Sequence, residues 1–176
     1  MRSEMRTVLF CAAMVSLAAT NTGQGQESLS DQEALSRLVG AWTLVDWDET
    51  LADGTVRKHP VTEGRIIYTD IGEMCAVVMD PNRPHWESGG APTPEEALAG
   101  TDSRVFYAYC ARAEMHADEG YALHHTIIDK IPNNVGAVRK RWFRFLGPDR
   151  IQLRIDEAEL RDPVIRSELI WERVVD

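Results

Sequence analysis

The stretch Leu38-Val39-Gly40-Ala41-Trp42-Thr43-Leu44-Val45 decides the fold of this 176-residue chain. Gly40 ends the segment before it, and Trp42 opens a strand directly afterwards. Downstream, runs of strand-forming residues alternate with turn sequences such as Ala52-Asp53-Gly54, which predicts a succession of β-hairpins. A large aromatic side chain at the mouth of the first strand can plug one end of a small closed barrel, leaving the other end open to a ligand.

The hairpin pattern predicts an all-β protein, an antiparallel up-and-down barrel of about eight or nine strands. The expected strands are 42–48, 55–59, 65–69, 73–79, 104–117, 121–131, 137–146, 151–156 and 164–174. A short helix is expected within residues 27–39, capped by Ser30 or Asp31. The long connection 81–103 contains a second helix start, at Thr93-Pro94-Glu95-Glu96. A connection of this length in a compact barrel is often functional, so we expect it to act as a lid.

Residues 1–26 read as a secretory signal peptide. Arg2 and Arg6 precede the apolar run 7–19, and small or polar residues follow it. The run is too short to span a membrane, which takes about 20 apolar residues. We therefore expect an exported protein, periplasmic or secreted, whose mature part is one domain over residues 27–176, with no membrane insertion after cleavage.

The composition narrows the possible partners. The chain has 28 acidic and 19 basic residues and a net charge of −9, which argues against nucleic acid and anionic membranes as partners. Two cysteines outside the signal peptide, Cys75 and Cys110, can pair in an oxidising compartment or remain free thiols. Ligand spacing of the Cys-x-x-Cys or His-x-His type is absent, and neither His59 nor His85 supplies it. The sequence therefore predicts no metal site and no cofactor.

The order and spacing of several segments resemble the lipocalin-like domain family of small bacterial and fungal proteins. The matching segments are Leu38–Val45, Gly64–Thr69, Gly72–Met74, Met79–Pro84, Tyr107–Arg112, His124-His125, Pro132–Gly136 and Leu169–Val174. The resemblance covers residues 36–175 and implies a lipocalin-like barrel with an internal pocket, without implying a reaction. The chain departs from the family at Ala111 and Ala113, where Gly and Tyr are usual, and at Asn134, where Trp is usual. These differences alter the wall and rim of the expected pocket.

Alternation of side chains along each strand predicts which residues face the barrel interior. On 104–117 the inward set is Tyr107, Tyr109, Ala111, Ala113 and Met115. On 121–131, Asp129 is expected in water, and the resemblance agrees, which places His124 inside. On 137–146 the set Arg139, Arg141 and Phe143 is favoured over Val138, Lys140 and Trp142.

The expected interior groups predict a small-molecule site, with a few polar groups in an apolar cavity. Proposed ligand-binding residues are Tyr68, Met74, Tyr107, Tyr109, His124, Arg141 and Trp86. A buried arginine needs a partner, which is a ligand carboxylate, an enolate oxygen or an interior Glu.

Two functional hypotheses follow. The first is a barrel that binds a small, mainly apolar molecule with a polar or anionic group. The second is a cofactor-free isomerase, cyclase or dehydratase acting on a carbonyl compound, with His124 as acid or base, Tyr109 as proton donor and Arg141 stabilising an oxyanion. The alternative to catalysis is that His124 and Tyr109 are hydrogen-bonded residues that only shape the wall of the pocket. Trp42 and Arg173 are expected to stack and close the blind end.

Overall fold

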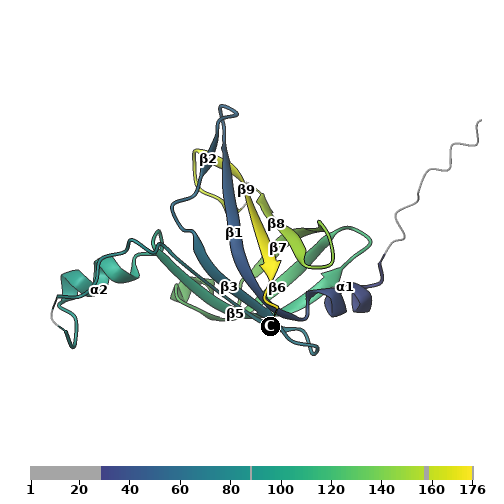
Figure 1. The fold of residues 1–176 in the computed structure, drawn as a ribbon, viewed down its shortest axis with the longest axis horizontal. Coiled ribbons are helices and arrows are strands. Elements are labelled where there is room, and N and C mark those ends of the chain that lie inside the picture. The colour runs from purple at the N-terminus through teal and green to yellow at the C-terminus, as the bar shows by residue number, and fades with distance from the viewer. Residues whose placement is uncertain (1–28, 88, 157–158, 176) are drawn as a thin grey trace, which may run out of the picture.

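The structure, a computed structural model, describes residues 29–87, 89–156 and 159–175. All strands form one antiparallel sheet in the order β2-β1-β3-β4-β5-β6-β7-β8-β9, and an additional β1–β9 pairing closes it into a barrel (Figure 1). The strands are β1 (Gly40–Leu51), β2 (Val56–Lys58), β3 (Glu63–Tyr68), β4 (Glu73–Met79), β5 (Phe106–His116), β6 (Tyr121–Asp129), β7 (Val138–Phe145), β8 (Arg150–Asp156) and β9 (Val164–Arg173). Eight strands form the closed barrel and β2 pairs with β1 alone, which confirms the expected fold class.

In the described part of the chain, three helical segments accompany the barrel: α1 (Asp31–Leu38), α2 (Pro94–Thr101) and the short 3₁₀ helix η1 (Pro132–Asn134). Ser30 caps α1 in a capping box with Glu33, and Thr93 does the same for α2 with Glu96, as the sequence predicts. None of the helices within the described residues is long and apolar enough to cross a membrane. The predicted signal peptide, residues 1–26, lies outside the described residues.

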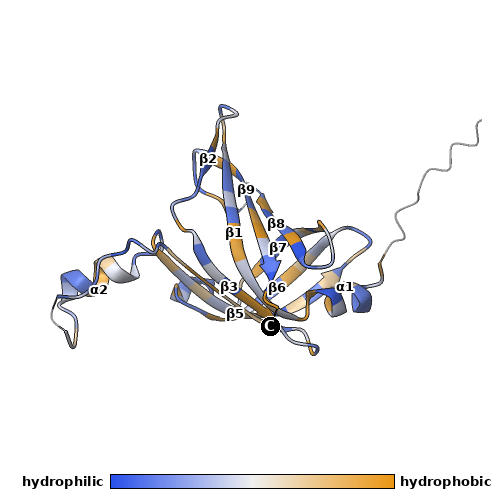
Figure 2. Ribbon diagram, in the orientation of Figure 1, coloured by the Kyte–Doolittle hydropathy of each residue, from blue (hydrophilic) through white to orange (hydrophobic). Residues whose placement is uncertain are grey.

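Alternating burial along the strands builds the core inside the barrel. In β3 every second residue is buried, and β4 follows the same pattern over most of its length. Figure 2 shows polar and apolar residues interleaved along the strands. Since successive side chains of a strand point to opposite faces, this alternation sends one set inward and the other into solvent.

The blind end of the barrel is closed as the sequence predicts. Trp42 is fully buried, and its indole Nε1 donates to the Leu38 carbonyl at 2.8 Å. The Arg173 guanidinium lies 4.1 Å from the Trp42 ring centroid. It also donates to the carbonyls of Arg37 and Val39, each at 2.7 Å, and so fixes the C-terminal end of α1 across the barrel floor.

One expectation about side-chain direction is wrong. Alternation places Asp129 in water and Ile128 inside, but the Asp129 side chain has no exposed area and Ile128 is 64% exposed. The reason is a β-bulge: Cys110 pairs with Ile128 and Ala111 with Thr126, so Ile127 is an extra residue. An extra residue reverses the facing of everything beyond it.

Cys75 and Cys110 face each other on β4 and β5 and form a disulfide. The pair joins neighbouring strands on the outer side of the barrel, because the alternate residues Met74, Ala76, Tyr109 and Ala111 are the buried ones. The sequence leaves open whether these thiols are paired, and the structure resolves the choice.

We predict that Gly64→Ala destabilises the barrel. A Cβ at Gly64 meets Leu44 Cβ at 2.9 Å, Val78 Cγ1 at 3.0 Å and Trp171 Cη2 at 3.3 Å. Crowding of this kind in a packed core costs about 1–3 kcal/mol of unfolding free energy. Urea unfolding measures the loss. Gly147→Ala is the control, because a Cβ there meets nothing within 4 Å and Gly147 has no positive φ. Equal stability of both variants and the wild type would contradict the packing described.

Candidate functional site

The barrel encloses a cavity of about 130 Å³ with mainly apolar walls. Its lining residues are Trp47, Ile66, Ala76, Val78, Tyr107, Tyr109, Arg139, Arg141, Leu153, Ile155, Leu169 and Trp171. Most of them lie toward the ends of the strands opposite the floor made by Trp42 and Arg173. The cavity therefore belongs to the open half of the barrel, as the plugged-barrel hypothesis expects.

Below this cavity, one histidine bridges two tyrosines. The hydroxyl of Tyr109 lies 2.9 Å from His124 Nδ1, and the hydroxyl of Tyr68 lies 3.2 Å from His124 Nε2. All three side chains are buried, and His124 has no exposed area. A neutral imidazole donates from one nitrogen and accepts at the other, so two hydroxyl groups satisfy it completely. Only Tyr109 of the three also borders the cavity.

Burial determines the protonation state of this cluster. Desolvation, with a smaller contribution from the positive charges of Arg141 and Arg139, lowers the pKa of His124 to about 3. Burial also raises the pKa of Tyr68 well above its ordinary value. His124 is therefore neutral at physiological pH, and Tyr68 keeps its proton. A base with so low a pKa accepts a proton weakly near neutrality, so the cluster is better suited to orienting Tyr109 than to general-base catalysis.

Arg141 is buried, and its charge has a partner within the chain. Its Nη1 donates to Glu159 Oε2 at 2.7 Å and to the Lys140 carbonyl at 2.8 Å. Of the three partners that the sequence allows for this arginine, the structure therefore supplies a glutamate. The inward direction of Arg139 and Arg141, favoured from the strand pattern, is confirmed.

Asp129, Arg139 and Tyr107 form a second polar cluster at the cavity wall, which the sequence did not predict. Arg139 Nη2 binds Asp129 Oδ2 at 2.8 Å, with only 15% of the arginine side chain exposed. The Tyr107 hydroxyl donates to the same Asp129 oxygen at 2.6 Å and also contacts Arg139 Nη2. Burial, followed by the hydrogen bond to Asp129, raises the pKa of Tyr107. Sequence reasoning missed this cluster because the β6 bulge brings Asp129 inside.

The predicted site residues fall into three groups. Tyr107, Tyr109 and Arg141 line the cavity. Tyr68, Met74 and His124 are buried inside the barrel but are not part of the cavity wall. Trp86 is 45% exposed and lies outside the barrel. Trp47 and Arg139 also line the cavity, but neither was predicted as a ligand-binding residue. Strand alternation had already placed Arg139 inside the barrel, whereas no feature of the sequence pointed to Trp47.

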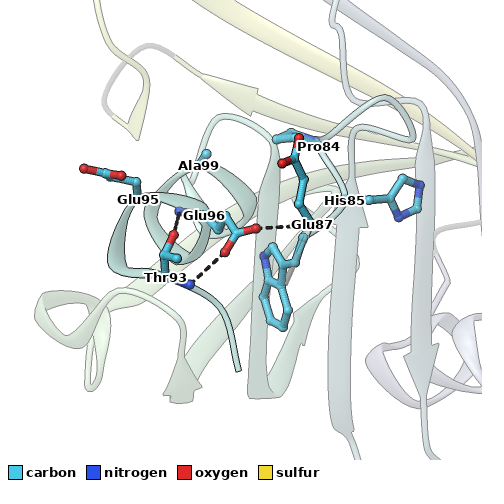
Figure 3. Close-up of a pocket in the computed structure, with 8 residues that line it drawn as sticks. Pro84, His85, Glu87, Thr93, Glu95, Glu96 and Ala99 are labelled. Carbon is cyan, nitrogen blue, oxygen red and sulfur yellow. Dashed lines mark hydrogen bonds between the residues drawn. The ribbon is translucent and has the colours of Figure 1, made fainter. Parts of the chain in front are cut away.

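The connection 81–103 makes a separate hollow on the surface. It has a volume of about 670 Å³ and is lined by Pro84, His85, Trp86, Glu87, Thr93, Glu95, Glu96 and Ala99 (Figure 3). Glu96 binds the backbone N–H groups of Thr93 and Glu87 there, at 2.8 and 2.7 Å. These contacts cap α2 and hold the loop together, which makes this hollow a product of local structure.

The helix expected in the connection is confirmed as α2, but it stands to one side of the barrel (Figure 1). Among its described residues, the connection contributes none to the cavity wall. Trp86 packs against α2 instead, with its Nε1 3.0 Å from where a Cβ on Gly100 would lie. The role of the segment as a lid stays a prediction.

The profile of the lipocalin-like domain matches residues 39–174. The chain belongs to this lipocalin-like domain family. Among solved structures, it is similar to a redesigned β-barrel, at 10% identity and TM-score 0.40, over 81% of this chain and 96% of that one. It is also similar to a polyisoprenoid-binding domain from Saccharophagus degradans implicated in plant cell wall breakdown, at 9% identity and TM-score 0.33, over 76% and 98%. A comparison with curated proteins finds no significant match.

Metal-ligating side chains do not gather anywhere in the described part of the chain: no group of three or more His, Cys, Asp or Glu residues there could hold a metal ion. The polar side chains among the residues that line the cavity are Tyr107, Tyr109, Arg139 and Arg141.

We predict that His124 makes stability fall as the pH falls. The unfolded chain protonates this histidine near pH 6.5, while the folded chain resists protonation down to about pH 3. The unfolded state therefore binds more protons in this window, and between pH 7 and pH 4 the wild type loses on the order of 3 kcal/mol that a His124→Gln variant keeps. Well above pH 6.5, where the unfolded chain no longer protonates the histidine, the contribution of His124 to stability is constant.

Urea unfolding at pH 7, 5.5 and 4 measures this difference. His125→Gln is the matched control, because His125 is the next residue on β6 and points outward to Glu114. It should retain the wild-type pH dependence. Identical pH slopes for the wild type and His124→Gln would contradict the buried neutral imidazole.

Proposed function

We propose that this protein is an exported lipocalin-like barrel that binds a small, mainly apolar molecule carrying a polar or anionic group. The observation that carries the proposal is the cavity: its apolar walls, which include Trp47 and Trp171, are interrupted by Tyr107, Tyr109, Arg139 and Arg141. A concave apolar site with a few fixed polar groups is the usual form of a small-molecule site.

In this proposal, the cavity residues orient the ligand's polar group. Tyr109 and Arg141 border the cavity and are held by His124 and Glu159. Tyr68 and Met74 support the cavity wall from the floor side of the barrel. Tyr68 does so by its hydrogen bond to His124, and Met74 by packing in the core. The connection 81–103, with Trp86, gates entry by moving against the rim, since it leaves the barrel at the open ends of β4 and β5.

A catalytic role for the same site has one supporting observation. Tyr109 joins the cavity to His124 by a 2.9 Å hydrogen bond, which is the arrangement of a tyrosine acid backed by a histidine. An isomerase, cyclase or dehydratase acting on a carbonyl compound would use this pair with Arg141. The low pKa of His124 favours binding over catalysis. An enzyme would keep affinity and lose turnover by about a hundredfold in His124→Gln.

We predict that filling the cavity abolishes binding of p-cresol, a single-ring probe with one hydroxyl group. The cavity of about 130 Å³ is near the roughly 150 Å³ that holds benzene in an engineered protein cavity. Ala76 lines the cavity, so Ala76→Phe puts a ring where the ligand would lie. Calorimetry should detect p-cresol binding to the wild type and at least a tenfold loss of affinity in Ala76→Phe.

Val77→Phe is the matched control, because Val77 is the next residue on β4 and is 42% exposed. It should bind p-cresol as the wild type does. Equal binding by Ala76→Phe and Val77→Phe would place the probe outside the barrel and count against the proposal.

The disulfide between Cys75 and Cys110 supports the proposed export, since structural disulfides persist in oxidising compartments. We expect protein recovered from the periplasm or medium to have lost its N-terminus near residue 26. Iodoacetamide should leave Cys75 and Cys110 unmodified until a reductant is added, as read by mass spectrometry of peptides. A chain that retains Met1 and has both thiols alkylated without reduction would contradict export.

A further inference from the structure

Two arginines carry the charge in the wall of the barrel cavity. Among its described lining residues, Arg139 and Arg141 alone are charged at neutral pH. Their guanidinium groups lie beside the tyrosines of the wall: that of Arg139 is 5.0 Å from the Tyr109 ring centroid and 5.4 Å from that of Tyr107, and that of Arg141 interacts with the Tyr109 side chain. Because Coulomb interactions act over several ångströms in a poorly solvated interior, a charge on a ligand in this cavity would interact with both arginines.

Each of these arginines is neutralised by a carboxylate of the protein itself. Arg139 Nη2 lies 2.8 Å from Asp129 Oδ2, and the Asp129 side chain has no exposed area. Asp129 also accepts a hydrogen bond from the Tyr107 hydroxyl at 2.6 Å, which fixes its position. Arg141 Nη1 lies 2.7 Å from Glu159 Oε2. The two arginines of the wall therefore belong to two ion pairs, which together carry no net charge.

Glu159 reaches its arginine from outside the strands. Asp129 belongs to β6, whereas Glu159 follows the end of β8. Within the described residues, β8 pairs with β7 over Trp142–Phe145, so the part of β7 nearer the open end lies beyond this pairing. Glu159 binds there: its Oε1 accepts from the Lys140 backbone N–H at 2.8 Å, and its Oε2 accepts from Arg141. One carboxylate thus satisfies the edge of β7 and compensates the Arg141 charge.

We propose that Glu159 determines which ligand charge the barrel accepts: by neutralising Arg141, it makes the cavity select uncharged polar molecules over anions. The inference rests on the proposed function and narrows its ligand to the neutral class. With both arginines paired, an anion would enter as an uncompensated charge in a poorly solvated site, which is unfavourable. Without the Glu159 charge, Arg141 would itself be uncompensated, with only 7% of its side chain exposed, and an anion would restore the balance.

Benzamide and benzoate test this selectivity, because they have equal heavy-atom counts and similar shapes, and only benzoate carries a charge. Calorimetry at neutral pH measures both affinities. The wild type should bind benzamide about tenfold more tightly than benzoate. In Glu159→Gln the affinity for benzoate should rise about tenfold, while the affinity for benzamide should change by less than about twofold. Glutamine keeps an acceptor for the Lys140 N–H, so we expect this variant to fold.

Glu172→Gln is the matched control, since it removes the same charge at a distance from the cavity. Glu172 is half exposed and forms a 3.4 Å ion pair with Arg150 near the barrel floor. This variant should retain the wild-type preference for benzamide. In the double variant Glu159→Gln/Arg141→Met both charges are gone, so benzoate should lose the affinity that it gains in Glu159→Gln. A gain retained in the double variant would overturn the role assigned to the Arg141–Glu159 pair.

Equal wild-type affinities for benzamide and benzoate would overturn the inference, and this comparison stands even if Glu159→Gln fails to fold. An unchanged benzoate affinity in folded Glu159→Gln would overturn it as well. Binding of p-cresol without binding of benzamide would overturn this inference and leave the proposed function standing. Failure of both p-cresol and benzamide to bind would overturn both.

Discussion

Pairing of β1 with β9 is the constraint on which the rest of the structure depends. It runs from Trp42 opposite Arg173 to Leu51 opposite Val164 and turns a curved sheet into a closed barrel. At its lower end Trp42 fills the floor, while Arg173 lies across the ring and binds the last carbonyls of α1. Since the floor is sealed from both the strand and helix sides, the remaining internal space can open only at the opposite end.

The closed interior accepts polar side chains because each group has a partner, with one exception. His124 is held between two tyrosines, and the interior arginines are paired with Asp129 and Glu159. These contacts fix the side chains that border the cavity and leave little freedom for rearrangement. Trp171 alone keeps an unused donor among the described residues of the cavity wall. A cavity whose polar side chains are fixed in this way favours recognition by complementarity over proton-transfer chemistry.

Strand periodicity predicted much of this interior. The succession of hairpins predicted the closed meander, and the adjacency of the first and last strands in such a meander predicted the stacking of Arg173 on Trp42. Alternation along the strands predicted the inward direction of Tyr109 and Arg141 and, together with the family resemblance, that of His124. Alternation failed at Asp129, because an extra residue at Ile127 reverses the facing and leaves no mark in the sequence pattern. Contacts set by distance in space, such as Glu159 with Arg141 or the Cys75–Cys110 disulfide, could not be read from spacing along the chain.

Native mass spectrometry of the protein purified from its own cells shows directly whether the barrel cavity is occupied by a ligand. We expect one discrete added mass, released on denaturation, with the composition of a small, mainly apolar molecule that carries a polar or anionic group. The same preparation of Ala76→Phe should be free of it, because the new ring takes the ligand's volume. An added mass that persists in Ala76→Phe would place the ligand elsewhere, and a bare wild-type protein would contradict a tightly held occupant.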